Sequence, residues 1–248
     1  MKRFFLLIGL LVFAVSAQES ESPELDSSTV EQSAAPVDER VLVRSILDES
    51  GLKTMTVDDV ATFEDGRVTV LDLSNRDVSQ DGLSQFPMGV FKLTALMNLQ
   101  IQDNMIRSLP EEIGNLTELR ELNLGSNPLG ELPASVGNLS KLLKLDIRYC
   151  ELSDLPEEFG QLTSLELLQM WGNRFTTLPE CISKLESLKE IYLKDNRLTT
   201  LPEFMTKMPN LKYVGVHLNK ICDLDPKVEK WLVSKDKRYK AFQKCPME

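Results

Sequence analysis

The side chains that most often perform chemistry in proteins do not form a recognisable catalytic or metal-binding motif in this sequence. His217 is the single histidine in 248 residues, and no serine or cysteine stands with it in a nucleophile motif. The four cysteines show neither a CxxC pair nor the mixed Cys/His spacing of a zinc site. Carboxylates are numerous, but none form a recognisable pair for general acid–base work. We therefore expect no enzymatic activity, no bound metal and no cofactor.

Aromatic and basic side chains suit a different chemistry, the binding of a partner. Tryptophan, tyrosine and arginine are enriched at the energetic centres of protein interfaces. In the second half of the chain, the candidate binding residues are Arg148, Tyr149, Gln169, Trp171, Tyr192, Lys194, Tyr213 and His217. They can act together only if the elements that carry them bring them onto one surface.

A period of 23 residues organises those elements. The asparagines in step with it are Asn104, Asn127, Asn173, Asn196 and Asn219, with Cys150 in the one missing slot. The prolines in step with it are Pro87, Pro110, Pro133, Pro156, Pro179 and Pro202. Apolar residues fall at fixed offsets, so that the unit is LxxLxLxxNxLxxLPxxIxxLxx. A strict period of this size predicts stacked units whose apolar faces cover one another.

The unit resembles the leucine-rich repeat family in its 23-residue form with a Leu-Pro step, over residues 68–221 in about seven units. The LxL segment has the period of two that is typical of a short strand. The resemblance implies an α/β solenoid, a curved superhelix with a parallel sheet on its concave face and helical caps at both ends. The asparagine is expected to satisfy backbone groups at the bend after each strand, and Cys150 to do so less well.

Residues between the strand leucines should face outward on the concave sheet. The first half of this surface is small and polar, whereas the eight residues named above gather on the second half. We predict that they form the partner-binding surface. The competing interpretation is that strands tolerate aromatic residues in any case and that neighbouring side chains cover one another.

The N-terminal region has three predicted parts. Residues 1–17 join Lys2-Arg3, an apolar run and Val15-Ser16-Ala17, the pattern of a secretory signal peptide; a membrane anchor is the alternative, although the run is short for one. Residues 18–36 are polar and acidic and predict a disordered linker. Residues 37–67 predict a cap with an amphipathic helix over 38–50 and a hairpin at Asp65-Gly66.

Residues 222–248 predict a C-terminal helical cap, in which Trp231 closes the open end of the core. Cys222 and Cys245 flank this segment, and in an exported protein they would form a disulfide; two free thiols are the alternative. Cys150 belongs to the repeat core and Cys181 to the convex side. Asn115 and Asn138 begin glycosylation sequons, but both coincide with the repeat consensus.

The charge balance limits the partners. The net charge of −10 becomes −12 when Lys2 and Arg3 are removed, which argues against nucleic acid and anionic lipid. We expect a non-catalytic, exported module, secreted, periplasmic or on the cell surface, that binds a protein or peptide through its concave sheet and does not insert into a membrane after signal removal. The alternative is binding of a cell-wall or extracellular glycan by the exposed Trp and Tyr side chains. A stiff structural spacer is also consistent with a solenoid.

Overall fold

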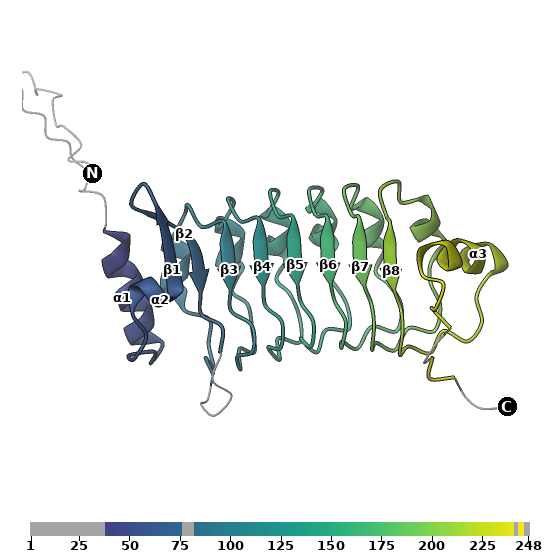
Figure 1. The fold of residues 1–248 in the computed structure, drawn as a ribbon, viewed down its shortest axis with the longest axis horizontal. Helices are drawn as coiled ribbons and strands as arrows, with labels where there is room; N and C mark the ends of the chain where they lie inside the picture. The colour runs from purple at the N-terminus through teal and green to yellow at the C-terminus, as the bar shows by residue number, and fades with distance from the viewer. Residues whose placement is uncertain (1–37, 76–81, 241–242, 246–248) are drawn as a thin grey trace, which may run out of the picture. The chain divides into compact units, whose positions relative to one another are not determined.

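The computed structural model describes residues 38–75, 82–240 and 243–245, so the predicted signal peptide and linker lie outside the described residues. One sheet runs through the repeats in chain order, from β1 (Ala61–Glu64) to β8 (Figure 1). After β1, the strands are β2 (Arg67–Asp72), β3 (Asn98–Gln100), β4 (Glu121–Asn123), β5 (Lys144–Asp146), β6 (Leu167–Gln169), β7 (Glu190–Tyr192) and β8 (Tyr213–Gly215). From β2 onward each pair is parallel, which confirms the predicted sheet.

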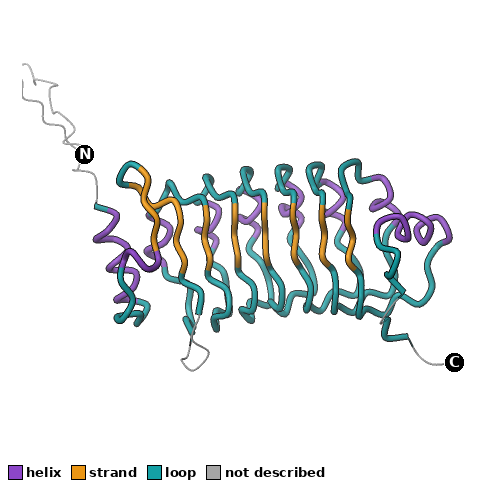
Figure 2. Tube along the Cα trace, in the orientation of Figure 1, coloured by secondary structure: helices purple, strands orange, loops and turns teal. Residues whose placement is uncertain are grey.

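Short 3₁₀ helices form the second layer, behind the sheet (Figure 2). They are η1 (Met88–Lys92), η2 (Glu111–Asn115), η3 (Ala134–Asn138), η4 (Glu157–Gln161), η5 (Glu180–Lys184) and η6 (Glu203–Lys207). Each begins directly after a periodic proline, whose own backbone is extended, as expected for that residue; the helical turn after it was not predicted. Three residues per turn place residues i and i+3 on one side, so Ile113 and Leu116 both point inward and are fully buried.

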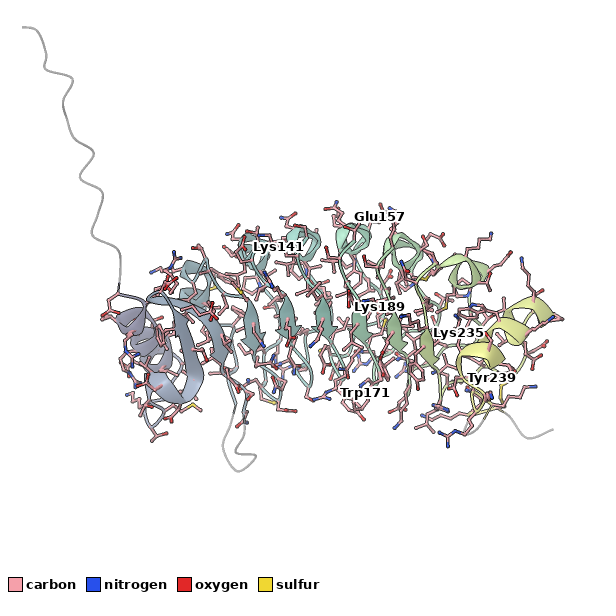
Figure 3. All side chains as sticks on the ribbon, turned by 45° about the horizontal axis from the view of Figure 1, so that its top comes forward. Lys141, Glu157, Trp171, Lys189, Lys235 and Tyr239 are labelled. Atoms are coloured by element: carbon pink, nitrogen blue, oxygen red, sulfur yellow. A yellow bond between two sulfur atoms is a disulfide. The ribbon has the colours of Figure 1, made fainter. Side chains whose placement is uncertain are left out.

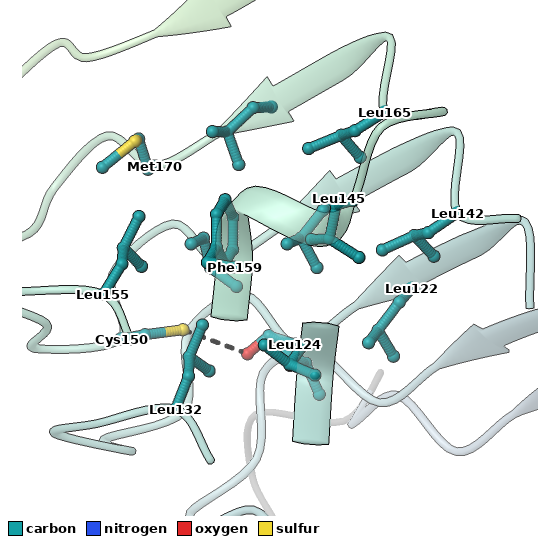
Figure 4. Close-up of a cluster of buried hydrophobic side chains, with 14 of the residues drawn as sticks. Leu122, Leu124, Leu132, Leu142, Leu145, Cys150, Leu155, Phe159, Leu165 and Met170 are labelled. Carbon is teal, nitrogen blue, oxygen red and sulfur yellow. Dashed lines mark hydrogen bonds between the residues drawn. The ribbon is translucent and has the colours of Figure 1, made fainter. Parts of the chain in front are cut away.

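The core lies between the two layers and is continuous along the stack. Leu122, Leu145 and Leu168 are paired strand residues with at most 1% of their surface exposed. Phe159 of η4 fills the space opposite them (Figure 4). Because one repeat is too thin to cover its own leucines, each depends on its neighbours for this burial.

Buried asparagines join successive turns at the end of each strand. The Nδ2 of Asn173 donates to the carbonyls of Ile147 at 2.8 Å and Met170 at 3.0 Å, and its Oδ1 accepts from the amides of Cys150 and Leu152, both at 3.0 Å. This confirms the role expected from the period, because the side chain satisfies backbone groups that no strand bond reaches.

Cys150 reproduces only part of that pattern. Its Sγ donates to the carbonyls of Leu124 at 3.3 Å and Arg148 at 3.4 Å. A thiol offers no counterpart to the amide oxygen, and the amide of Leu129 bonds instead to the carbonyl of Asn127 within its own turn. The link between these two turns is therefore poorer, as expected.

The N-terminal cap consists of α1 (Glu39–Glu49), α2 (Val57–Val60) and β1 (Ala61–Glu64). β1 pairs antiparallel with β2 through a turn at Asp65 and Gly66, whose φ angles of 50° and 76° suit the predicted hairpin. Glu39 is buried and accepts from the amide of Val68 at 2.6 Å, a contact that the sequence did not reveal. Val43, Ile46 and Leu47 form the buried face of α1, whereas Val41 is 65% exposed.

The C-terminal cap is α3 (Pro226–Lys235), which starts at the N-cap side chain of Asp225. Trp231 packs against the core, as predicted, but it is only partly buried, and Val228 and Leu232 are the buried residues of this helix. The reason is geometric: the segment is an α-helix, in which the residue four positions on also returns to the same face. Cys222 and Cys245 are joined by a disulfide.

Candidate partner-binding surface

The variable strand residues project from one face of the sheet, in the register of the strand pairs. Gln169 lies beside Asp146 on one side and Tyr192 on the other, and Tyr213 lies beside Glu190. The eight residues predicted for binding divide into a cluster around Trp171, a tyrosine pair and His217. We call the first two groups together the aromatic patch: Arg148, Tyr149, Gln169, Trp171, Lys194, Tyr192 and Tyr213.

Trp171 is the centre of the first group. The ring of Tyr149 meets it edge-on, with ring centroids 4.7 Å apart. The guanidinium carbon of Arg148 lies 5.4 Å, and the Nζ of Lys194 5.9 Å, from the centroid of the Trp171 ring, so that two cations flank one indole. Trp171 lies on the opposite side of the repeat region from Glu157 of η4 (Figure 3).

Tyr149 is held in place by the turn that follows β6. The φ of Tyr149 is 51°, and its ring lies directly over Gly172. The Cβ of any other residue at position 172 would lie 2.2 Å from Cδ1 of the tyrosine, so glycine is required for this contact. Gly172 has a φ of 71°, which also favours glycine. Tyr149 nevertheless remains 46% exposed. The sequence pattern does not indicate this role of Gly172, because it arises from contact between two turns.

Tyr192 and Tyr213 form the second group, with ring centroids 5.0 Å apart. The hydroxyl of Tyr192 donates to Glu190 Oε2 at 2.8 Å, and this hydrogen bond is the largest reason that the pKa of Tyr192 is raised to about 12. Burial, followed by the charge of Asp236, raises the pKa of Tyr213. Both phenols therefore stay neutral hydrogen-bonding groups. Gln169 joins the two groups, since its Oε1 lies 3.5 Å from the indole Nε1 of Trp171.

The side chain of His217 contacts the C-terminal cap. Its Nε2 lies 3.2 Å from Oδ2 of Asp236, a residue that follows α3. The histidine therefore joins the last repeat to the cap. It does not stand with a serine or cysteine nucleophile among the residues that the structure describes.

The N-terminal half of the same sheet face is polar and largely self-paired. Asn123 Nδ2 donates to Gln100 Oε1 at 3.0 Å, and Asp146 Oδ1 accepts from the amide of Arg148 at 3.0 Å. Burial raises the pKa of Asp146, while the hydrogen bond from Arg148 opposes that shift. These side chains satisfy each other, so this half offers less unused binding capacity than the aromatic patch.

A cavity of about 500 Å³ opens at the turn edge next to the patch, and Tyr149 lines both. Its charged lining residues are Glu151, Arg174, Asp195, Arg197 and Lys244. We call it the corner cavity. The basic residues of its lining were not predicted, because Arg174 and Arg197 follow the asparagine slot rather than lying on the strands and Lys244 belongs to the C-terminal segment.

The described part of the chain shows neither a metal-binding cluster nor a reactive thiol. No cluster of three or more His, Cys, Asp or Glu side chains there is placed to hold a metal ion. Burial raises the pKa of the Cys150 thiol to about 12 and that of Cys181 to about 11, so both thiols stay protonated. Within the described ranges, no helix combines the length and apolar character needed to cross a bilayer.

The geometry defines a class of protein, the parallel-stranded solenoid with short 3₁₀ return segments. The family model described as a leucine-rich repeat region matches residues 43–171, slightly more than half of the chain. This chain belongs to the leucine-rich repeat family. No curated protein matches it in a sequence comparison.

Three solved structures illustrate the likeness. A leucine-rich repeat protein of Leptospira interrogans is 31% identical with a TM-score of 0.58, and the match covers 67% of this chain and 47% of that protein, so this chain spans about half the relative's length. The Arabidopsis receptor kinase HAESA, solved with a peptide hormone and a co-receptor, is 31% identical with a TM-score of 0.50, covering 56% and 24%. Internalin C2 of Listeria monocytogenes shares the fold, at 21% identity, a TM-score of 0.57 and coverage of 78% and 79%.

Proposed function

We propose that this protein is an exported recognition module that binds a protein or peptide partner through the aromatic patch. The fold is that of a protein–protein interaction module. The observation that carries the proposal is the placement of Trp171, which stands on the solvent side of the sheet between the ring of Tyr149 and the cation of Arg148. An indole in that position adds nothing to the leucine core, and aromatic residues flanked by arginine are typical of interface hot spots.

A peptide partner is favoured by two further features. The patch offers flat rings and neutral phenols beside amide and cationic groups, which suits backbone and side-chain contacts of an extended segment. The related repeat domain of HAESA was solved with a peptide hormone. We therefore place the partner among proteins or peptides rather than nucleic acids, in keeping with the net charge of −10.

Export is part of the same proposal. The signal-peptide pattern of residues 1–17 and the disulfide between Cys222 and Cys245 both favour an oxidising compartment outside the cytosol. The proposed locations are the periplasm, the cell surface and the surrounding medium. Fractionation of the native cells with an antibody against the repeats would identify which applies, and a protein found only in the cytosol would contradict export.

Capture of the partner from the native extracellular fraction tests the binding surface. The double variant Trp171→Ala/Tyr192→Ala should lose the captured partner and keep its melting temperature within a few degrees, because both side chains lie on the solvent face. Met105→Ala combined with Val41→Ala is the matched control, since it removes two exposed apolar side chains elsewhere. Equal capture by the wild type and the Trp171/Tyr192 variant would place the site on another surface.

A glycan ligand is the alternative that the same experiment separates. Trp171, Tyr192 and Tyr213 could stack on sugar rings, but no contact in the structure favours sugar over peptide. A glycan array probed in parallel with the capture would decide, and a Trp171-dependent signal on the array without a captured protein would replace the proposal.

A further inference from the structure

The corner cavity adds a charge preference to the binding surface. Its two acidic lining residues are already paired with two of its three basic ones. Arg174 Nη2 lies 2.8 Å from Glu151 Oε2, and Lys244 Nζ lies 2.8 Å from Asp195 Oδ1. Arg197 is exposed and forms no side-chain ion pair with any residue that the structure describes. The lining therefore holds one cation more than it can neutralise.

The repeat places that cation in a column of like charges. Arg174, Arg197 and Lys220 occupy the position after the asparagine in three successive turns, and all three are exposed. The three residues lie in the loops that follow the strands. Arg174 is paired with Glu151, whereas Arg197 in the next turn is left without an ion pair to any described residue, so an anion of the partner would complete the row.

The aromatic patch continues the same charge. Arg148 and Lys194 flank Trp171, and Tyr149 contacts the Trp171 ring and also lines the corner cavity. The net charge of the whole chain is −10, so a basic corner of this kind is a local exception. Long-range attraction does not favour an acidic ligand here; short-range contacts would have to select it.

Resting on the proposed function, we infer that the partner segment is acidic and that one of its carboxylates enters the corner cavity and binds Arg197. A guanidinium matches a carboxylate with two parallel hydrogen bonds, a geometry that a lysine does not offer. An apolar or aromatic residue of the same segment then contacts Tyr149 and Trp171. The occupant is thus an acidic peptide segment, distinct from a neutral one of the same length.

Fluorescence anisotropy with two labelled peptides tests the inference on the purified protein. The peptides are acetylated and amidated and differ only in four residues, all Glu in one and all Gln in the other. We expect the Glu peptide to bind at least about tenfold more tightly, the size of one charged hydrogen bond. Equal binding of the two peptides would overturn the inference.

Two charge reversals locate the contact. Arg197→Glu should remove the preference for the Glu peptide, whereas Arg120→Glu, an exposed arginine before β4, makes the same change in net charge outside the cavity lining. Thermal melts of both variants establish that they fold. If Arg120→Glu weakens the Glu peptide as much as Arg197→Glu does, the preference is a general charge effect and the cavity is not the site.

The native partner separates this inference from the proposed function. Capture that depends on Trp171 and Tyr192 but is unchanged in Arg197→Glu would keep the proposed function and overturn the acidic contact. Capture that is lost in Arg197→Glu and retained in Arg120→Glu supports both.

Discussion

At the scale of single residues, asparagine and cysteine in the same slot show what the slot requires. Asn173 both donates and accepts, and so joins two turns through four backbone groups. Cys150 donates through sulfur and leaves the Leu129 amide to a carbonyl of its own turn. The sequence predicted this difference because the donors and acceptors of each side chain are fixed by its chemistry.

Asn173→Ala should lower the free energy of unfolding by about 1–3 kcal/mol, since it leaves buried amides and carbonyls without partners. Chemical denaturation of the two proteins measures the difference. Cys150→Ala is the matched control and should cost less, because the contacts it removes are two weak sulfur bonds. A larger loss for Cys150→Ala than for Asn173→Ala would contradict the assigned roles.

The carboxyl group of Asp146 should make the stability of the folded protein depend on pH. Burial raises its pKa above the ordinary value, so the folded protein holds this proton more tightly than the unfolded chain does. The wild type therefore loses stability as the pH rises from the unfolded-state pKa through the raised folded-state pKa. Asp146→Asn keeps the Oδ1 acceptor and lacks this loss.

We expect the stability of Asp146→Asn relative to the wild type to increase between about pH 3 and about pH 7. Urea titrations at both pH values measure it. Asp223→Asn, a change at an exposed carboxyl far along the chain, serves as the control. A relative stability that is constant or decreasing for Asp146→Asn would show that the contact with Arg148 outweighs burial.

At the scale of elements, the sequence predicted the strands better than the segments between them. The period of two in LxL identified every parallel strand, because alternate residues must face opposite sides of a sheet. The proline that keeps the period is itself extended, but the sequence did not reveal the 3₁₀ helices η1 to η6 that follow it. The apolar spacing of three after the proline fits a 3₁₀ turn, a signal that could have been used.

The C-terminal cap carries the next prediction. Leu232→Asp should lower the free energy of unfolding by about 3–5 kcal/mol, because it places an unpaired carboxylate against the last repeat. Val233→Asp, on the exposed side of the same helix, should change it by no more than about 0.5 kcal/mol. Thermal or urea unfolding distinguishes the two. Similar losses from both variants would show that helix α3 as a whole, rather than its buried face, is sensitive.

At the scale of the repeat domain, the sequence determined the architecture and the sheet face of the candidate site, and missed the contacts between turns. Arg148, Tyr149, Trp171 and Lys194 lie together as predicted, because they follow successive strands that pair in register. Two features depend on how the loops after the strands pack: the contact of the Tyr149 ring with Gly172, and the corner cavity. Loop positions have no period of two to reveal their direction, and Lys244 reaches the cavity from the far end of the chain.

Stability should be distributed locally along the stack, since strands pair only with their sequence neighbours. Leu168→Ala should cost about 2–5 kcal/mol and should speed amide exchange most in β5, β6 and β7. Leu99→Ala should instead speed amide exchange most in β2, β3 and β4. Hydrogen–deuterium exchange with mass spectrometry maps both variants. An identical exchange map for the two would indicate a single cooperative unit instead.

The two ends of the sheet are closed in different ways, and this bears on self-association. The first parallel strand is covered by the antiparallel β1, while the last turn is covered by α3 and by a strap in which Gln243 and Lys244 bond to Val216 and Asn219. Two copies meeting end to end would set a hairpin against a helix, so neither could lengthen the other's ladder. Growth into a fibre by head-to-tail addition is thereby disfavoured. Even when the protein is concentrated, its aromatic side chains therefore stay free to bind a partner.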